Sequence, residues 1–168
     1  MLRNFIANIF KPKFLYRWIV KSKAKECKGK LAVNGFSTVS KNTFLGYNVN
    51  FNGMKITGKG RCVIGDNFHS GTNCQIMTDY HNYDKGDSIP YDNSVITKDV
   101  TIGDNVWLGN NVIILPGVTL GEGCVIQAGS VVVNDIAPLS VAGGHPAKVF
   151  KMRDVEHYNT LKEQKKFN

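Results

Sequence analysis

The chain has little of what marks several common protein classes. Its 168 residues include only five prolines and four cysteines, and no two cysteines form a CxxC pair. The usual signature of a zinc or redox site is therefore missing, and we expect structural thiols in a reducing cytoplasm. The apolar stretch near the N-terminus is interrupted by Lys11, Pro12 and Lys13. It is too short for a membrane span or a secretory signal, so we expect a cytoplasmic protein.

Acidic residues are almost absent from the first thirty positions. Nine Lys and Arg residues there face a single acidic residue, Glu26, and this excess accounts for the whole net charge of +8. Such a basic end predicts attraction to anionic lipid or another anionic surface, with a solvated helix face as an equal alternative. The remaining chain has no basic stripe or recognition motif, so nucleic acid is not expected as a partner.

Residues 3–22 predict one or two short amphipathic helices, with Pro12 as the break between them. The segment 1–30 is therefore expected to be a basic, amphipathic helical unit. Two uses of its apolar face stay open. Residues 1–25 lie at a membrane surface as a peripheral contact, or the helix packs on the body of the protein or on a neighbouring subunit.

Glycine is abundant, with 17 residues, and the apolar residues follow a period of six. A helix repeats every 3.6 residues and a strand every two, so neither produces this period. It predicts a solenoid that turns a corner after each hexad and buries one residue per hexad. The longest run of hexad positions consists of Ile102, Leu108, Ile114, Leu120, Ile126 and Val132.

The same register extends toward the N-terminus, with one slipped residue before Ile64. Three hexads would form a triangular coil, with each side a short parallel strand about 4.8 Å from its equivalent in the next coil. Gly and Asn in the repeated motif IGDN tolerate the positive φ of a sharp corner. Cys74 and Cys124 each follow a hexad position by four and are expected to pack inward. The earlier hexad positions are Val33, Val39, Leu45, Phe51, Ile64, Ser70 and Ile76.

Residues 77–95 interrupt the repeat with polar and aromatic residues and include His81. They predict a distorted coil or a protruding loop, after which Ile96 is expected to restore the phase. Loops on rigid scaffolds often carry chemistry. At the other end, residues 153–166 predict a final helix with Leu161 and Phe167 as its apolar anchors.

Residues 102–151, from IGDNVWLGNN to GGHPAKVFK, resemble the hexapeptide-repeat acetyltransferases, especially the branch with maltose, galactoside and polysaccharide O-acetyltransferases. The resemblance implies an all-β fold, a left-handed parallel β-helix over residues 31–152. The helical segment 1–30 would precede it and a short helical tail, 153–168, would follow. It also implies a homotrimer with active sites between subunits, acetyl-CoA as co-substrate, a sugar or glycan acceptor, and no metal.

The resemblance also implies roles for single residues. His81, in TDYHNYD, corresponds to the catalytic histidine and would act as general base, since an imidazole titrates near neutral pH. Trp107 would line the groove near the acceptor, and Asn52 matches an acceptor-binding region. Asp79 and Tyr83, beside His81, are further candidates for substrate binding.

For coenzyme A, small residues would line a narrow groove and cations would meet the phosphates. The resemblance assigns the groove to Gly109, Ala128 and Gly129, and the phosphates to Lys148 and Lys151.

Three other functions stay open from the sequence. An N-acetyltransferase for an amino sugar or an antibiotic would share the fold and change only the acceptor. A γ-type carbonic anhydrase needs three histidines on one metal, whereas the repeat region holds only His69 and His81. A non-catalytic scaffold would use no histidine at all.

Overall fold

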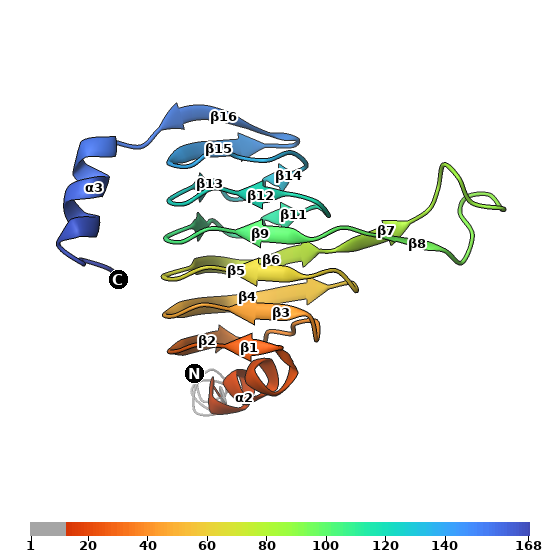
Figure 1. Ribbon diagram of the computed structural model, residues 1–168, viewed down its shortest axis with the longest axis horizontal. Helices are drawn as coiled ribbons and strands as arrows, with labels where there is room; N and C mark the ends of the chain where they lie inside the picture. The colour runs from red at the N-terminus through yellow and green to blue at the C-terminus, as the bar shows by residue number, and fades with distance from the viewer. Residues whose placement is uncertain (1–12) are drawn as a thin grey trace, which may run out of the picture.

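The structure, a computed structural model, describes residues 13–168 and is a stack of parallel coils (Figure 1). The first part of the expected N-terminal helices, with Pro12, lies outside the described residues. Each coil contributes short strands to the faces of the prism, which confirms the expected parallel β-helix.

One face is a five-stranded parallel sheet in which equivalent strands of successive coils pair directly. Phe44 pairs with Val63 and Val63 with Thr101, so these side chains form an outward column. From the lower end upward, the strands are β1 (Glu26–Cys27), β3 (Thr43–Leu45), β5 (Cys62–Ile64), β9 (Val100–Ile102) and β12 (Thr119–Leu120).

The other two faces form one nine-stranded sheet, because the long strand β6 pairs with both β10 and β11. Only β15 and β16 pair antiparallel in this sheet, and they close its upper end. Its strands are β2 (Leu31–Gly35), β4 (Val49–Thr57), β6 (His69–Met77), β10 (Trp107–Leu108), β11 (Ile113–Ile114), β13 (Val125–Ile126), β14 (Val131–Val132), β15 (Ser140–Gly144) and β16 (Ala147–Met152).

The hexad register is confirmed by burial, since every predicted inward position from Val33 to Val132 except Ile96 is at most 3% exposed. The residue two before most of these positions is also buried, and Cys62, Cys74 and Cys124 occupy such places as free thiols. Burial raises the pKa of Cys62 to about 12, so this thiol is an inert part of the core.

The corners confirm the expected positive φ at Asn but not at the Gly of IGDN. Asn67 and Asn105 have φ values of 54° and 58°. Gly65 serves a different purpose, because a Cβ there would lie 2.8 Å from the backbone nitrogen of Asp104 in the next coil. The coils therefore stack too closely at this corner for any side chain.

The excursion is a protruding loop, which settles the two alternatives for residues 77–95. Strands β7 (Asp79–His81) and β8 (Val95–Thr97) form an antiparallel hairpin that projects from one side of the prism (Figure 1). The prediction for Ile96 is wrong, because this residue pairs with Tyr80 in the hairpin and is only half-buried. The register resumes at Ile102, which pairs with Ile64.

Helix α2 (Lys13–Lys23) lies across the lower end of the stack (Figure 1), where Val20 is fully buried. This helix therefore contacts the body of the protein through Val20, whereas Phe14, Leu15 and Trp18 stay exposed. The solenoid begins earlier than residue 31, because β1 already pairs with β3. Within residues 13–168, no helix combines the length and apolar character needed to cross a bilayer.

Helix α3 (Val155–Glu163) is shorter than the expected 153–166 and packs on the side opposite the hairpin (Figure 1). Asp154 caps it by accepting a hydrogen bond from the His157 N–H, at 2.9 Å. Its predicted anchors were wrong. Tyr158 is the buried residue, whereas Leu161 is half-buried and Phe167 is 44% exposed.

Candidate active site

Several of the predicted site residues lie along one corner of the prism. We call this line of residues, Asn52, Thr72, Gly109, Asn110, Ala128 and Gly129, the corner column. Asn52 pairs with Thr72 between β4 and β6, and the Thr72 N–H donates to Asn110 Oδ1 at 2.8 Å. The Gly129 N–H in turn donates to the Asn110 carbonyl at 2.8 Å. The fold thus joins the predicted acceptor residue to the predicted coenzyme A residues.

The lower end of the corner column is a polar pocket with aromatic walls. Asn52 is held in place, because its Nδ2 donates to the Ser70 carbonyl at 2.6 Å and its Oδ1 accepts from Asn34 Nδ2 at 3.0 Å. The rings of Tyr16 and Phe36 meet edge to face, 5.8 Å apart. The pocket has a volume of about 350 Å³ and is lined by Tyr16, Asn34, Gly35, Phe36, Asn52 and Thr72. Amides and aromatic rings together suit a polar organic ligand.

The middle of the corner column is a strip of bare backbone. A Cβ on Gly109 would lie 2.5 Å from the Ala128 nitrogen, so only glycine fits there. Gly129 has a φ of 73°, and its missing Cβ would point into open space. Ala128 is exposed, and no backbone carbonyl of residues 13–168 accepts a hydrogen bond from its N–H. A thin chain with its own amides, such as pantetheine, fits this strip.

The upper end is basic. The hairpin of β15 and β16 is tied to the corner column by the Gly144 N–H, which donates to Ser130 Oγ at 3.1 Å. Lys148 is exposed and pairs with Gly143 in this hairpin, and Lys151 is exposed further along β16. Two exposed lysines at this end suit the phosphates of coenzyme A.

His81 lies on the projecting hairpin with its side chain exposed. Its ring stacks on Tyr91, with centroids 3.9 Å apart and an angle of 16° between the planes. Tyr91 therefore orients the imidazole, a role that the sequence did not suggest. Asp79 lies at the base of the hairpin, where its Oδ2 accepts from the Lys59 N–H at 3.0 Å. Tyr83 is exposed near His81, and its N–H donates to the His81 carbonyl at 3.0 Å.

Trp107 lines a second groove, of about 400 Å³, between β10 and α3. Its side chain is 57% exposed, and the half-buried His69 lies beside it in the neighbouring coil. The hairpin with His81 projects from the opposite side of the prism (Figure 1). A single chain therefore does not bring His81 to Trp107.

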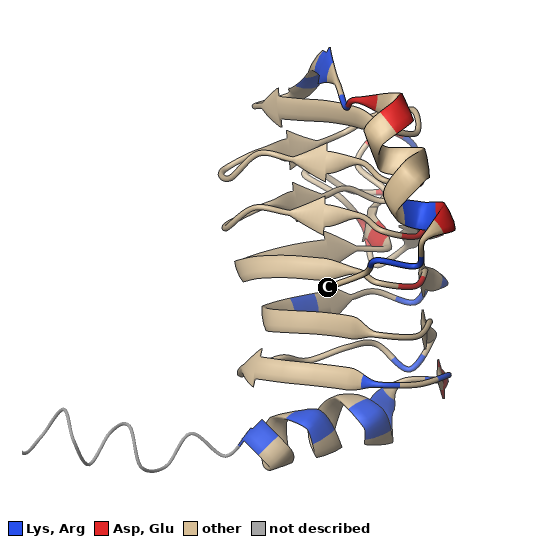
Figure 2. Cartoon of the chain, turned by 90° about the vertical axis from the view of Figure 1, so that its left-hand side faces the viewer, with Lys and Arg blue, Asp and Glu red and all other residues tan. Residues whose placement is uncertain are grey.

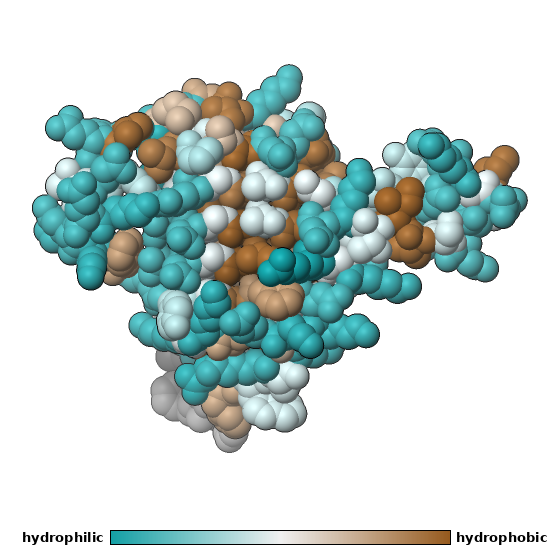
Figure 3. Space-filling view, viewed as in Figure 1, coloured by the Kyte–Doolittle hydropathy of each residue, from teal (hydrophilic) through white to brown (hydrophobic). Residues whose placement is uncertain are grey.

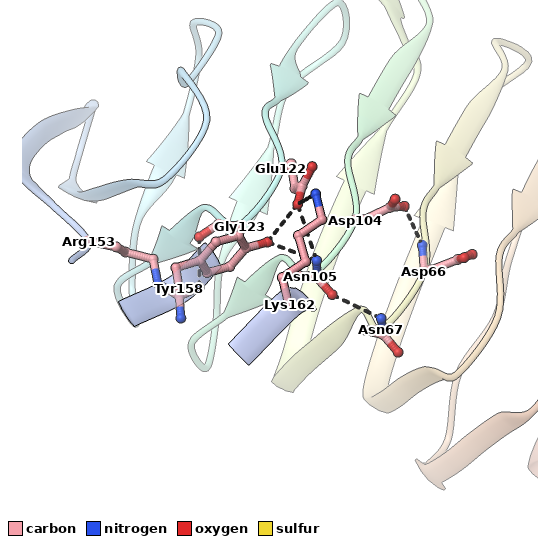
Figure 4. Close-up of polar contacts among 9 residues, drawn as sticks. All are labelled: Asp66, Asn67, Asp104, Asn105, Glu122, Gly123, Arg153, Tyr158 and Lys162. Atoms are coloured by element: carbon pink, nitrogen blue, oxygen red, sulfur yellow. Dashed lines mark hydrogen bonds and ion pairs between the residues drawn. The ribbon is translucent and has the colours of Figure 1, made fainter. Parts of the chain in front are cut away.

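A cluster of polar side chains holds α3 against the coils (Figure 4). Residues of α3 also line the Trp107 groove. The Tyr158 hydroxyl donates to Glu122 Oε1 at 2.9 Å and accepts from Asn105 Nδ2 at 2.8 Å. Lys162 Nζ lies 2.6 Å from the same Glu122 oxygen. Arg153 covers the Tyr158 ring, 4.7 Å from its centroid.

The pKa values in this cluster follow from burial and pairing. Burial, then the Glu122 carboxylate, raise the pKa of Tyr158 to about 12. For Glu122, burial alone would raise the pKa, but the hydrogen bonds and charge of Lys162, together with the bonds from Tyr158 and Asn105, outweigh it and lower the pKa. The carboxylate is therefore charged when α3 is docked.

Among residues 13–168, no three His, Cys, Asp or Glu side chains lie close enough to hold a metal ion together. The metal set of a γ-type carbonic anhydrase would have to draw on more than one subunit.

Comparison with known proteins agrees with this geometry. Residues 92–134 match the family profile of the bacterial transferase hexapeptide, six repeats. A maltose O-acetyltransferase from Clostridium difficile 630 is 34% identical, with a TM-score of 0.69 over 84% of this chain and 74% of that chain. A hexapeptide-repeat acetyltransferase from Vibrio cholerae, solved with acetyl-CoA, is 28% identical, with a TM-score of 0.68 over 83% and 74%.

A Schizosaccharomyces pombe protein that carries an acetyltransferase name is 41% identical over 114 residues, or 61% of this chain and 52% of that protein. The chain thus spans about half the length of this relative. The coil geometry, the repeat profile and the Clostridium structure together identify the fold as the left-handed parallel β-helix. The chain belongs to the hexapeptide-repeat acetyltransferase family.

Proposed function

We propose that this protein is an acetyl-CoA-dependent O-acetyltransferase that acts on a hydroxyl of a sugar or polysaccharide intermediate. The observation that carries the proposal is the corner column. It joins a pocket of amides and aromatic rings, a bare backbone strip and a lysine hairpin in one line. Acetyl-CoA bound to the Vibrio relative and maltose in the name of the Clostridium relative support both substrates.

A homotrimer is part of the proposal, because His81 and the Trp107 groove lie on opposite sides of one chain. The face of the five-stranded sheet suits contact with a second copy. Glu26 in β1 is charged, but the outward residues of the strands above it, Phe44, Val63, Thr101 and Thr119, are not. Figure 3 shows pale and brown residues in the middle of this face. In a trimer, the hairpin of one subunit would reach the corner column of the next.

The proposed reaction is direct transfer. His81 removes the proton from the acceptor hydroxyl while the hydroxyl oxygen attacks the thioester carbonyl of acetyl-CoA. The carbon–sulfur bond then breaks, and the imidazolium returns the proton to the coenzyme A thiolate. Tyr91 would keep the ring oriented during both transfers. Such acid–base help contributes about 10²–10⁴-fold in rate.

Each remaining site residue has a place in this proposal. Lys148 and Lys151 would hold the coenzyme A phosphates, while Gly109, Ala128 and Gly129 would line the pantetheine arm. Asn52 would bind the acceptor at the lower end, and Trp107, Asp79 and Tyr83 would line the approach to it from the groove and the hairpin. We further propose a cytoplasmic location with peripheral contact at the inner membrane surface, which would suit a lipid-linked glycan.

The test blocks the backbone strip. Ala128→Leu would place a branched side chain where pantetheine is expected, and Ala137→Leu makes the same change at an exposed alanine of a different corner. We expect Ala128→Leu alone to weaken acetyl-CoA binding in calorimetry. Release of coenzyme A thiol with a panel of sugars, glycans and amino sugars would then identify the acceptor and separate O- from N-transfer. No thiol release with any acceptor, or equal binding by both variants, would contradict the proposal.

A further inference from the structure

We propose that the outward face of α2 is a docking surface for an anionic phospholipid bilayer. We call this surface, formed by Phe14, Leu15, Arg17, Trp18 and Lys21, the α2 outer face. Its geometry does not depend on the proposed catalysis. Only its link to a lipid-attached acceptor, described below, rests on the proposed function.

The burial pattern divides α2 into two faces. Tyr16 and Val20, one turn apart, point to the prism, and Val20 is fully buried. Phe14 and Trp18, also one turn apart, are 71% and 64% exposed, and Leu15 beside them is 39% exposed. Val20 already anchors the helix in the core, so these large apolar side chains are not needed to hold it there. Aromatic side chains of this kind favour the headgroup region of a bilayer.

The charges of α2 agree with an anionic partner. The helix contains four basic residues and no acidic one, and Figure 2 shows Lys and Arg along its length at the lower end of the stack. Lys25, Lys28 and Lys30 follow on the same end and are exposed. Each basic side chain near an anionic membrane surface strengthens binding about fivefold.

A second copy of the chain fits this surface poorly. Two such ends facing each other would bring a row of lysines and arginines against an equal row, and like charges across an interface oppose association. Nucleic acid would satisfy the charges but not three exposed apolar side chains on one face. An anionic bilayer satisfies both the charges and the apolar side chains.

The position of α2 links this surface to the acceptor pocket. Tyr16, on the inner side of the helix, is a wall of the pocket that contains Asn52. The outer side faces away from the coils across the end of the stack (Figures 1 and 2). A bilayer against the α2 outer face would therefore lie next to the lower end of the corner column. If the proposed function holds, this arrangement would admit the headgroup of a lipid-linked glycan.

The test is flotation of the full chain with vesicles of phosphatidylcholine alone or with about one third phosphatidylglycerol, the charge-bearing component. We expect binding to the anionic vesicles only. Arg17→Gln with Lys21→Gln should weaken it about 30-fold, since two basic side chains are removed. Phe14→Gln with Trp18→Gln should also weaken it, whereas Lys41→Glu with Lys59→Glu, two exposed lysines outside α2, should retain most of it. Circular dichroism verifies the fold of each variant.

Three results would overturn the inference. The first is that the wild-type chain does not bind anionic vesicles. The second is that the α2 variants and the control variant bind them equally. The third is that the α2 variants keep vesicle binding but change in oligomeric state or in RNA binding. Coenzyme A release with a water-soluble acceptor, measured without vesicles, should be unchanged in the α2 variants. If the wild-type chain releases coenzyme A but does not bind anionic vesicles, this inference fails and the proposed function stands. If it binds anionic vesicles but releases no coenzyme A with any acceptor, the proposed function fails and this inference stands.

Discussion

Removing the Tyr158 hydroxyl should release α3 without unfolding the coils. Tyr158→Phe deletes one hydrogen bond to the charged Glu122, at 2.9 Å, and one from Asn105, at 2.8 Å. A bond to a charged group contributes about 1.5–3 kcal/mol and a neutral one about 1 kcal/mol. Because the Glu122 side chain is 33% exposed, we take about 2 kcal/mol for the pair. The undocked population of α3 should then rise about 30-fold.

The assay is tryptic cleavage in the C-terminal segment, at Lys162 and Lys165, under native conditions. When docking is fast relative to cleavage, the cleavage rate follows the undocked population. Tyr47→Phe is the matched control, since Tyr47 is 55% exposed and its hydroxyl bonds to no residue of 13–168. The same cleavage rate in Tyr158→Phe and wild-type protein would refute the assigned role of the cluster. A lower melting temperature of the whole domain in Tyr158→Phe would show that the substitution does not act on α3 alone, and would refute a local effect.

Three further predictions concern the coil interior, the pairing of Glu122 with Lys162 and the proposed site between subunits. Ile114→Ala removes a fully buried side chain from the coil interior and should lower the free energy of unfolding by about 2–5 kcal/mol, measured by urea denaturation. The pKa of Glu122 is lowered in the folded state, so its carboxylate stabilises the docked helix fully at pH values above the unfolded pKa of about 4.3. This stabilisation is lost as the pH falls through the lower pKa of the folded state. Lys162→Gln should move this loss, followed as pepsin sensitivity of α3, to higher pH. Co-expressed His81→Ala and Ala128→Leu chains should recover acetyl transfer in mixed oligomers. Inactivity of the mixture would contradict a site shared between subunits.

The hexad register could be predicted from the sequence because burial in a coil depends on local spacing. Each inward residue, such as Leu108 or Ile126, turns toward the axis wherever the chain makes corners at equal intervals. The excursion was also visible, since its polar and aromatic residues cannot fill an inward column. The prediction for Ile96 was wrong because an apolar residue at a hexad position can also lie in a hairpin, where Ile96 pairs with Tyr80.

The corner column could not be derived from spacing. The register between β4 and β6 shifts between Asn50 and Asn52, so counting hexads does not place Asn52 beside Thr72. The anchor of α3 was missed for a similar reason. Tyr158 is buried because Asn105 and Glu122, far away in the sequence, supply partners for its hydroxyl. The stacking of Tyr91 on His81 likewise depends on how the excursion folds back.

The assignment of His81 as the general base is tested by comparing the rate of acetyl transfer in His81→Ala with that in His157→Ala. His157 is an exposed histidine on α3, away from the hairpin. We expect His81→Ala to lower turnover about 10²–10⁴-fold while acetyl-CoA still binds, and His157→Ala to keep the wild-type rate. Wild-type turnover in His81→Ala would contradict the assignment of His81 as the general base.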